Sequence, residues 1–244
     1  MTKIQTQTLS YSAGGAALES YLAWDPAQAG PRPGVILLGE WWGMNDYLKR
    51  RARQVAELGY VALAADMYGG GCVAADASEA GQLMNGLFAD MTATGDRLRA
   101  HLAQLRAQPM VDGARIGAMG YCLGGALSLH AARLGLDLKG VISFHGALGR
   151  THEAQPGDIS AELLICHGAD DVMVPPDDVK AFQAEMQSLG AKFEFIAYPG
   201  AKHGFTNPEA TEKGEKFGLP LAYNEDVDRQ SWAAMKAFWT RVLG

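Results

Sequence analysis

Short apolar runs alternate along the chain with longer amphipathic stretches. Four runs have the length and continuous apolar character of buried parallel strands, at residues 35–38, 60–64, 116–119 and 141–144. Helices are predicted where apolar residues recur at helical spacing, over 46–58, 77–88, 93–107, 123–134, 176–189 and 228–242. This alternation predicts an α/β fold with a mostly parallel central sheet and helices on both faces.

The N-terminal region has a different pattern. Residues 6–11 and 18–24 have strand character and flank the pair Gly14-Gly15. Two short strands joined across paired glycines predict an antiparallel hairpin, which we place at the edge of the sheet. Two later apolar runs, at 161–168 and 193–198, are also predicted strands.

Composition and charge narrow the class of protein. The chain has 244 residues, of which 48% are hydrophobic, and contains neither an internal repeat nor a Pro/Ser-rich linker, so residues 1–244 are predicted to form a single domain. The net charge of −6 comes with scattered basic residues. That distribution has no electrostatic footprint for nucleic acid or an anionic membrane, and it favours a small-molecule substrate. We take a monomer as the default state.

The N-terminus and the cysteines indicate the compartment. The first residues lack an apolar stretch of signal-peptide type, and no segment approaches the roughly 20 apolar residues that span a bilayer. Three cysteines cannot all form disulfides, and their spacing is not that of a zinc ribbon. We therefore expect a cytoplasmic protein. We expect no cofactor and no metal, because the histidines have no H-x-H or H-x-E-x-H spacing.

The segment Gly120-Tyr121-Cys122-Leu123-Gly124-Gly125 lies between a predicted strand and a predicted helix. A strand, a sharp turn and a helix around G-x-C-x-G match the nucleophile elbow of α/β-hydrolases, with cysteine in place of the usual serine. Glycines beside the nucleophile let the strand and the helix approach closely. The N-terminus of the helix also favours the thiolate. Cys122 is therefore the candidate nucleophile.

The partners of a cysteine nucleophile follow in the order that this fold uses, an acid and then a histidine. Asp170 and Asp171 follow the predicted strand at 161–168, and His203 follows the strand at 193–198. The carboxyl ends of parallel strands converge at one edge of a sheet, where ligands bind. The sequence thus predicts a Cys-Asp-His triad in which either aspartate is the acid.

In combination, these motifs resemble those of the dienelactone hydrolases. The resemblance rests on residues 120–125, on Asp171-Val172-Met173-Val174-Pro175, on His203-Gly204-Phe205 and on Leu38-Gly39-Glu40-Trp41-Trp42-Gly43-Met44-Asn45, and it covers nearly the whole chain. It implies an α/β-hydrolase fold and the hydrolysis of esters or lactones through a thioester. The family places its aspartate four residues before the proline, which favours Asp171 over Asp170.

Two backbone N–H groups are expected to form an oxyanion hole, because acyl transfer develops negative charge on the carbonyl oxygen. In this fold they belong to the residue after the nucleophile, here Leu123, and to the loop after an early strand, here Trp41. By resemblance, Glu40 matches an acidic residue that contacts the resting thiol and moves when substrate binds. The alternative is a glutamate that caps the following helix.

The substrate pocket is less well defined by the sequence. Apolar walls are expected from aromatic residues and a methionine near the motifs, namely Trp41, Trp42, Met44, Tyr68, Tyr121 and Phe205. His145, and equally His167, could line the pocket or be buried structural histidines. Dienelactone hydrolases bind the substrate carboxylate with arginines, yet residues 67–91 contain no Arg or Lys, and Asn207 occupies the second place. A neutral acyl or aromatic ester is therefore favoured.

One long segment keeps two interpretations, and the remaining cysteines and histidines are interpreted as structural. The polar stretch 207–229 is either a lid over the pocket or a surface excursion packed by Phe217 and Leu221. Cys166 is expected to be a buried small hydrophobe and Cys72 a loop thiol. Surface positions are expected for His101, His130 and His152.

Two other functions remain open for the same motifs. Acyl transfer to an acceptor other than water, or thioester hydrolysis, would use the same triad. A non-hydrolytic ligand-binding or thiol-sensing protein would use the exposed, oxidisable thiol of the elbow, since one fold hosts unrelated functions. Multiple turnovers that depend on Cys122 would separate the enzyme from the sensor.

Overall fold

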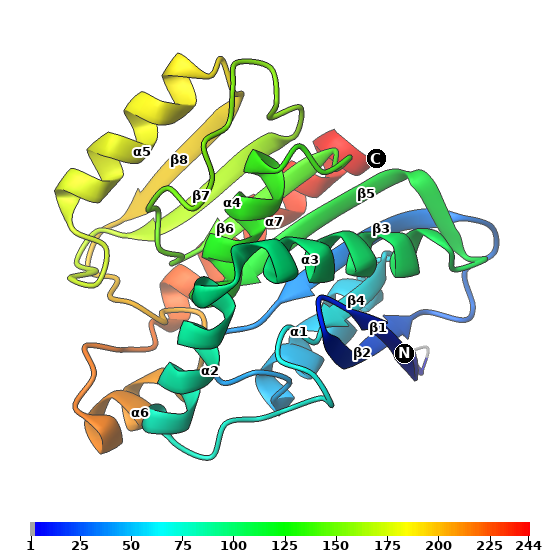
Figure 1. The fold of residues 1–244 in the computed structure, drawn as a ribbon, viewed down its shortest axis with the longest axis horizontal. Coiled ribbons are helices and arrows are strands. Elements are labelled where there is room, and N and C mark those ends of the chain that lie inside the picture. Colours follow the sequence, from blue (N-terminus) through cyan, green and yellow to red (C-terminus); the bar gives the residue numbers. More distant parts are fainter. Residues whose placement is uncertain (1–2) are drawn as a thin grey trace. The chain divides into compact units, whose positions relative to one another are not determined.

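The computed structural model describes residues 3–244, which form eight strands and seven helices (Figure 1). The strands form a mixed sheet in the order β1-β2-β4-β3-β5-β6-β7-β8. The predicted α/β class is thereby confirmed. The chain divides into two compact units, one ending at Ala118 and the other starting at Met119. The long strand β5 (Val111–Tyr121) crosses this boundary, and the two units are described in turn.

The first unit begins with the predicted hairpin. Strands β1 (Gln5–Ala13) and β2 (Ala16–Trp24) pair antiparallel over their full length, and β1 is an edge strand of the sheet. Gly14 and Gly15 make the turn with φ of 51° and 72°. Positive φ at both positions of a two-residue turn is typical of glycine. A Cβ on Gly14 would also lie 2.2 Å from the carbonyl oxygen of Ala93, so the turn packs tightly against a helix.

The rest of the first unit is built on parallel strands. Strands β3 (Arg32–Leu38) and β4 (Val61–Ala65) pair in parallel, and every residue of β4 is buried. Helices α1 (Asp46–Glu57) and α3 (Met91–Arg106) lie on opposite faces of these strands, and α2 (Ala77–Ala89) packs against α3 (Figure 1). Side chains of Asn45, Asp76 and Asp90 cap these three helices. Each helix lies within two residues of its predicted bounds.

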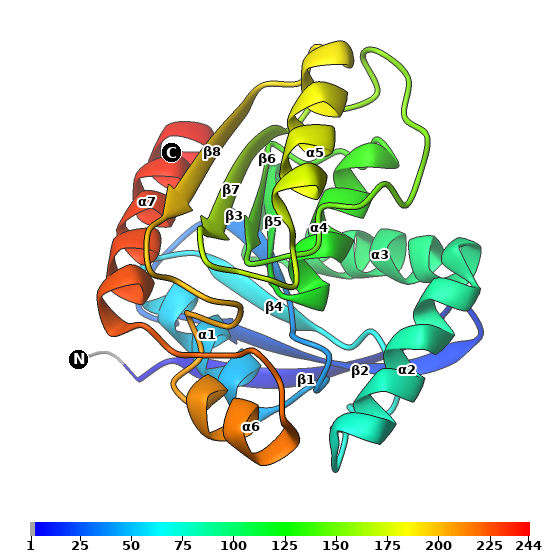
Figure 2. The ribbon, with the colours of Figure 1, turned by 90° about the vertical axis from the view of Figure 1, so that its left-hand side faces the viewer.

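The second unit places three strand ends at one edge. Strands β6 (Gly140–Phe144), β7 (Glu162–Gly168) and β8 (Phe193–Tyr198) pair in parallel. Helices α4 (Leu123–Arg133) and α5 (Pro176–Ser188) cover one face, and α7 (Glu225–Leu243) covers the other (Figure 2). Because the strands run in the same direction, the segments that follow them lie on the same side of the unit.

The stretch between His203 and the last helix contains a helix that was not predicted, α6 (Ala210–Phe217). Its Gly214 packs tightly, since a Cβ there would lie 2.8 Å from the carbonyl oxygen of Leu221. The helix ends at Gly218, which has φ of 65°. The last helix starts at Glu225 rather than at residue 228, because the side chain of Asn224 accepts a hydrogen bond from the backbone of Val227.

Two of the three histidines assigned to the surface are buried, so this prediction was wrong for His101 and His130. Their exposed fractions are 0% and 2%, whereas His152 is exposed. His101 lies on the inner face of α3, which also buries Leu98 and Leu105, so it shares a stripe at helical spacing. Its Nδ1 atom lies 2.5 Å from the hydroxyl of Tyr11, which satisfies one nitrogen of the ring.

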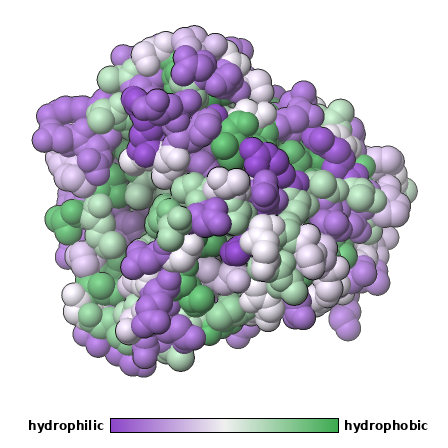
Figure 3. Space-filling model, in the orientation of Figure 1, coloured by the Kyte–Doolittle hydropathy of each residue, from purple (hydrophilic) through white to green (hydrophobic). Residues whose placement is uncertain are grey.

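Hydrophobic residues are interspersed with hydrophilic ones on the face drawn in Figure 3. Among the described residues, the large hydrophobic side chains with the greatest exposure are Leu58, Val73, Phe88, Val172 and Met173. Val172 and Met173 directly follow Asp171, so the loop that carries the candidate acid exposes apolar surface. None of the helices within residues 3–244 combines the length and the apolar character needed to cross a bilayer.

Candidate active site

Cys122 forms the sharp turn between β5 and α4. Its backbone has φ of 55° and ψ of −116°, a conformation that residues with a side chain rarely adopt. Such strain costs about 1–3 kcal/mol and persists only where the surroundings hold it. Here the N–H of Cys122 donates to the carbonyl of Phe144 at 3.0 Å, and its carbonyl accepts from the N–H of Ala126 at 3.2 Å. The half-buried thiol is thus presented at a rigid helix N-terminus.

The glycines around Cys122 allow close packing. A Cβ on Gly120 would lie 2.0 Å from the carbonyl oxygen of Gly124, within the turn itself. A Cβ on Gly125 would lie 2.6 Å from the hydroxyl oxygen of Ser143 at the end of β6. Both distances are far below van der Waals contact, so any other residue would displace α4 from the strand end.

His203 and Asp171 form a buried hydrogen-bonded pair in the same unit. His203 Nδ1 lies 2.8 Å from Asp171 Oδ2, and the side chains are 5% and 0% exposed. The other oxygen of Asp171 accepts a hydrogen bond from the backbone of Met173 at 2.9 Å, which fixes the carboxylate. Asp170, the competing acid, is exposed, and its backbone N–H donates to the carbonyl of Ala201.

The pKa of His203 reflects opposing influences. Burial lowers it, but the negative charge of Cys122 and the hydrogen bond to Asp171 raise it by more, to about 10. The Nε2 atom of His203 is buried and makes no hydrogen bond with any of residues 3–244. We therefore attribute the effect of Cys122 mainly to the proximity of its charge. This environment therefore favours the protonated form of His203.

Other side chains of the second unit surround this pair. His145, at the end of β6, is buried, and its ring centroid lies 5.2 Å from that of His203. Its Nε2 atom lies 2.8 Å from Thr206 Oγ1. His167 is also buried, which lowers its pKa; the charge of Asp171 raises that pKa and the charge of His203 lowers it.

Three residues predicted to contact substrate are buried in the second unit. Phe205 has an exposed fraction of 0%, and its ring lies 5.0 Å from that of His145. Tyr121 is equally buried and stacks on Phe144 at 5.0 Å. Asn207 is 1% exposed, and its side chain accepts a hydrogen bond from the backbone of Glu209. All three support the loops around the candidate site, while their contact with substrate stays a prediction.

The predicted residues after β3 lie in the first unit. Glu40 is buried, with an exposed fraction of 7%. The cap of the following helix α1 is Asn45, so Glu40 does not have the capping role considered as an alternative. The carbonyl of Trp41 accepts a hydrogen bond from the hydroxyl of Tyr68 at 2.9 Å, and that of Trp42 accepts one from the N–H of Ala74. The loop that carries Trp41 is therefore held from two sides.

A buried carboxylate that the sequence did not reveal organises the same region. Asp66, at the end of β4, is 0% exposed and accepts hydrogen bonds from four backbone N–H groups, those of Glu19, Tyr68, Gly69 and Gly71. Asp66 thereby shapes the glycine-rich loop and sets the position of Tyr68.

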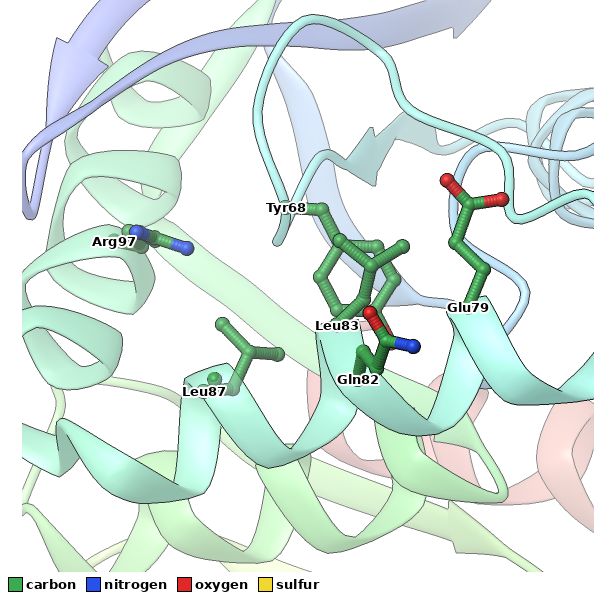
Figure 4. A pocket seen from close by; sticks show the side chains of 7 residues that line it. Tyr68, Glu79, Gln82, Leu83, Leu87 and Arg97 are labelled. Carbon is green, nitrogen blue, oxygen red and sulfur yellow. The ribbon is translucent and has the colours of Figure 1, made fainter.

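The first unit contains a cavity of about 400 Å³ between α2, α3 and Tyr68 (Figure 4). Leu83 and Leu87 line it from α2, and the guanidinium of Arg97 faces it from α3. Arg97 donates to the backbone carbonyls of Gly14 and Met67, and it forms no ion pair with a carboxylate in the described part of the chain. Glu79 and Gln82 also line it, so the cavity combines apolar side chains with one cation, one carboxylate and one amide.

The other thiols are poor candidates for a nucleophile. Burial raises the pKa of Cys166 to about 12, and burial together with the charges of Glu79 and Asp66 raises the pKa of Cys72. Cys72, Cys122 and Cys166 are all free of disulfides. Among residues 3–244, no three His, Cys, Asp or Glu side chains gather as metal ligands would. Of the three thiols, only that of Cys122 contributes to the raised pKa of His203.

Comparison with known proteins identifies the family to which this chain belongs. A profile described as the dienelactone hydrolase family matches residues 18–243. An uncharacterized protein of Caenorhabditis elegans is 35% identical over 145 residues, which cover 58% of this chain and 89% of that protein. A Salmonella typhimurium protein, provisionally named carboxymethylenebutenolidase, is 28% identical over 222 residues. That alignment covers 84% of this chain and 82% of the Salmonella protein.

Solved structures show the same fold. A dienelactone hydrolase-like promiscuous phosphotriesterase from metagenomic libraries aligns with a TM-score of 0.90 and 35% identity over 99% of both chains. A dienelactone hydrolase of Klebsiella pneumoniae, also provisionally named, aligns with a TM-score of 0.80 over 98% of this chain and 99% of its own. Its identity is 24%, so this second likeness concerns the fold alone.

Proposed function

The chain belongs to the dienelactone hydrolase family and is a hydrolase of ester or lactone bonds, and we propose that it acts through a triad of Cys122, His203 and Asp171. The observation that carries the proposal is the buried 2.8 Å hydrogen bond between His203 and Asp171, in the unit that also holds the strained Cys122. The influence of Cys122 on the pKa of His203 supports the same assignment.

The first half-reaction forms a thioester. The thiolate of Cys122 attacks the carbonyl carbon, and the carbonyl electrons move to the oxygen. When this tetrahedral intermediate collapses, the bond to the leaving alkoxide breaks, and His203 donates its Nε2 proton to the alkoxide. Asp171 keeps a proton on Nδ1 and stabilises the imidazolium. In a lactone, the leaving alkoxide remains joined to the acyl group.

The second half-reaction is hydrolysis. Neutral His203 takes a proton from water, and the resulting hydroxide attacks the thioester carbonyl. Collapse of the second intermediate breaks the C–S bond, which releases the carboxylic acid and restores the thiolate beside protonated His203. The backbone N–H groups of Leu123 and Trp41 are the proposed donors to the oxyanion in both steps.

Glu40 is proposed to contact the resting thiol and to move away when substrate binds, as the resemblance implies. Its burial supports a specific role, because ionisable side chains are rarely buried without one. Under this proposal, Glu40→Gln would remove an ionisable group that contacts the thiol. It should therefore shift the pH profile of Cys122 alkylation by iodoacetamide, and an unchanged profile would refute the role.

Arg97 is a candidate for recognition of a substrate carboxylate, although neither place expected by resemblance carries an arginine. It faces the cavity beside Tyr68, which Glu79 also lines, and it forms no ion pair with a carboxylate in the described chain. Arg97→Gln should raise KM for a carboxylated dienelactone about tenfold and leave KM for a neutral p-nitrophenyl ester nearly unchanged. Equal effects on both substrates would indicate that Arg97 only supports the loop at Met67.

The central experiment is steady-state hydrolysis of a cis-dienelactone and of short p-nitrophenyl esters by the wild type and Cys122→Ala. Loss of the nucleophile should lower kcat/KM on the order of 10⁴-fold. Cys72→Ala is the matched control, because it removes another free thiol in a loop and should retain activity. Stoichiometric modification of Cys122 without turnover would support the thiol-sensing alternative, and ester formation with an added alcohol would support acyl transfer.

Phosphotriester hydrolysis is a second candidate function, favoured by the solved phosphotriesterase that is 35% identical over 99% of this chain. A dialkyl aryl phosphate belongs in the same panel of substrates. Release of the aryl alcohol that is lost in Cys122→Ala would assign this activity to the same site. Release that persists in the variant would show that the activity is independent of the triad.

A further inference from the structure

His145 occupies a constrained turn at the end of β6. Its φ of 40° lies in the left-handed region, although it is not a glycine. The chain turns here close to α4: a Cβ on the next residue, Gly146, would lie 2.7 Å from the carbonyl carbon of Gly125 in that helix. The backbone N–H of His145 also donates to the carbonyl of Cys166 at 2.8 Å. The imidazole of His145 is therefore projected from a rigid point of the sheet.

The loop that carries His203 lies against this imidazole. Nε2 of His145 lies 2.8 Å from Thr206 Oγ1, three residues after His203. The ring of His145 also meets the ring of His203 edge to face, with centroids 5.2 Å apart and an interplanar angle of 66°. A similar contact joins His145 to Phe205 at 5.0 Å. One side chain thus contacts three residues of one catalytic loop.

We propose that His145 is a positioning residue that, with Thr206, sets the orientation of the His203 imidazole. This inference rests on the proposed triad. The hydrogen bond to Asp171 fixes Nδ1 of His203 but leaves the ring able to tilt about that bond. The edge-to-face contact with His145 restricts the tilt, and the hydrogen bond to Thr206 anchors the loop.

Orientation matters because proton transfer depends on where Nε2 points. A displacement of about 1 Å in a catalytic group can cost on the order of 100-fold in rate. Loss of the contact should therefore lower kcat, whereas KM should change little, since His145 acts on the histidine and not on bound substrate. A purely structural role would instead lower the melting temperature without a selective loss of kcat.

Thr206 provides a matched pair of variants. Thr206→Val keeps the shape of the side chain and removes the hydroxyl, whereas Thr206→Ser keeps the hydroxyl. With p-nitrophenyl acetate as substrate, we expect Thr206→Val to lower kcat about tenfold with KM within about twofold. Thr206→Ser should recover most of that loss. Equal kcat values for the two variants would overturn the proposal.

His145→Asn tests the ring itself. Asparagine tolerates the left-handed backbone, so the turn should be retained while the ring contacts are lost. We expect kcat to fall on the order of 100-fold and the pH midpoint of Cys122 alkylation to shift, with far-UV circular dichroism unchanged. An unchanged kcat and midpoint in the folded variant would overturn the role. Persistent activity of Cys122→Ala would instead refute the proposed triad. That result is distinct from an unchanged kcat in His145→Asn, which would refute only the role of His145.

Discussion

His203 Nδ1 hydrogen-bonds to Asp171 at 2.8 Å, whereas the adjacent Asp170 is exposed. Asp171→Asn should therefore remove the acceptor that fixes the imidazole tautomer and lower kcat about 10³- to 10⁴-fold. Asp170→Asn is the control, because it makes the same change one residue earlier and should stay within about twofold of the wild type. Steady-state ester hydrolysis measures both. The opposite ranking would exclude Asp171 as the acid of the triad.

The pKa of His203 makes stability depend on alkaline pH. This pKa is raised from 6.5 to about 10 in the folded protein. The stabilisation linked to the proton is complete below about pH 6.5 and is lost as the pH rises through 10. The melting temperature should therefore fall more steeply between pH 7 and 10 in the wild type than in His203→Gln. Parallel melting curves for the two proteins would contradict this assignment.

His101 should make stability depend on acidic pH in the opposite sense. Burial lowers its pKa from 6.5 to about 4, and the charge of Asp66 only partly opposes this effect. The neutral ring is favoured in the fold, so its stabilisation is present above about pH 6.5 and lost as the pH falls through 4. Urea unfolding at pH 7, 5.5 and 4.5 should show a smaller loss in His101→Gln. His152→Gln, at an exposed position, should behave as the wild type.

Two glycines should respond to alanine in opposite ways. Gly86 lies inside α2, and a Cβ there would meet no atom of residues 3–244 within 4 Å beyond its own helix, so Gly86→Ala should stabilise the protein by about 0.5–1 kcal/mol. Gly125→Ala should destabilise it, because the new Cβ would lie 2.6 Å from Ser143 Oγ. Free energies of unfolding in urea compare both variants with the wild type. A stable and active Gly125→Ala would show that α4 can shift.

The order of helices and strands could be predicted because each buried strand is a continuous apolar run and each long helix has an apolar stripe. Helix α6 could not, since its sequence Ala-Thr-Glu-Lys-Gly-Glu-Lys-Phe contains an interior glycine and few apolar residues. The burial of His101 was missed although Leu98 and Leu105 flank it at helical spacing. That apolar stripe was the sequence signal that could have predicted the burial of His101.

The candidate triad could be anticipated because Cys122, Asp171 and His203 each follow a strand in a characteristic order. Residues that act through distant partners left no such signal. Thr206 meets His145 across 61 positions of sequence, and Asp66 meets the backbone of Glu19 across 47. Arg97 was missed because cations were sought only between residues 67 and 91 and near the catalytic histidine, where Asn207, Lys202 and Lys213 lie. Tertiary contacts of this kind follow from the packing of the elements and not from any local pattern.

The stretch after α6 returns to the loop of His203. Leu221 forms a parallel bridge with His203, the N–H of Ala222 donates to the carbonyl of His203 at 3.1 Å, and that of Asn224 donates to the carbonyl of Phe205. A movement of residues 219–224 away from this loop would break those bonds and release the backbone of His203, the proposed catalytic base. If His203 is the base, opening of residues 219–224 and proton transfer by His203 are therefore mutually exclusive, because the first disrupts the backbone that the second requires.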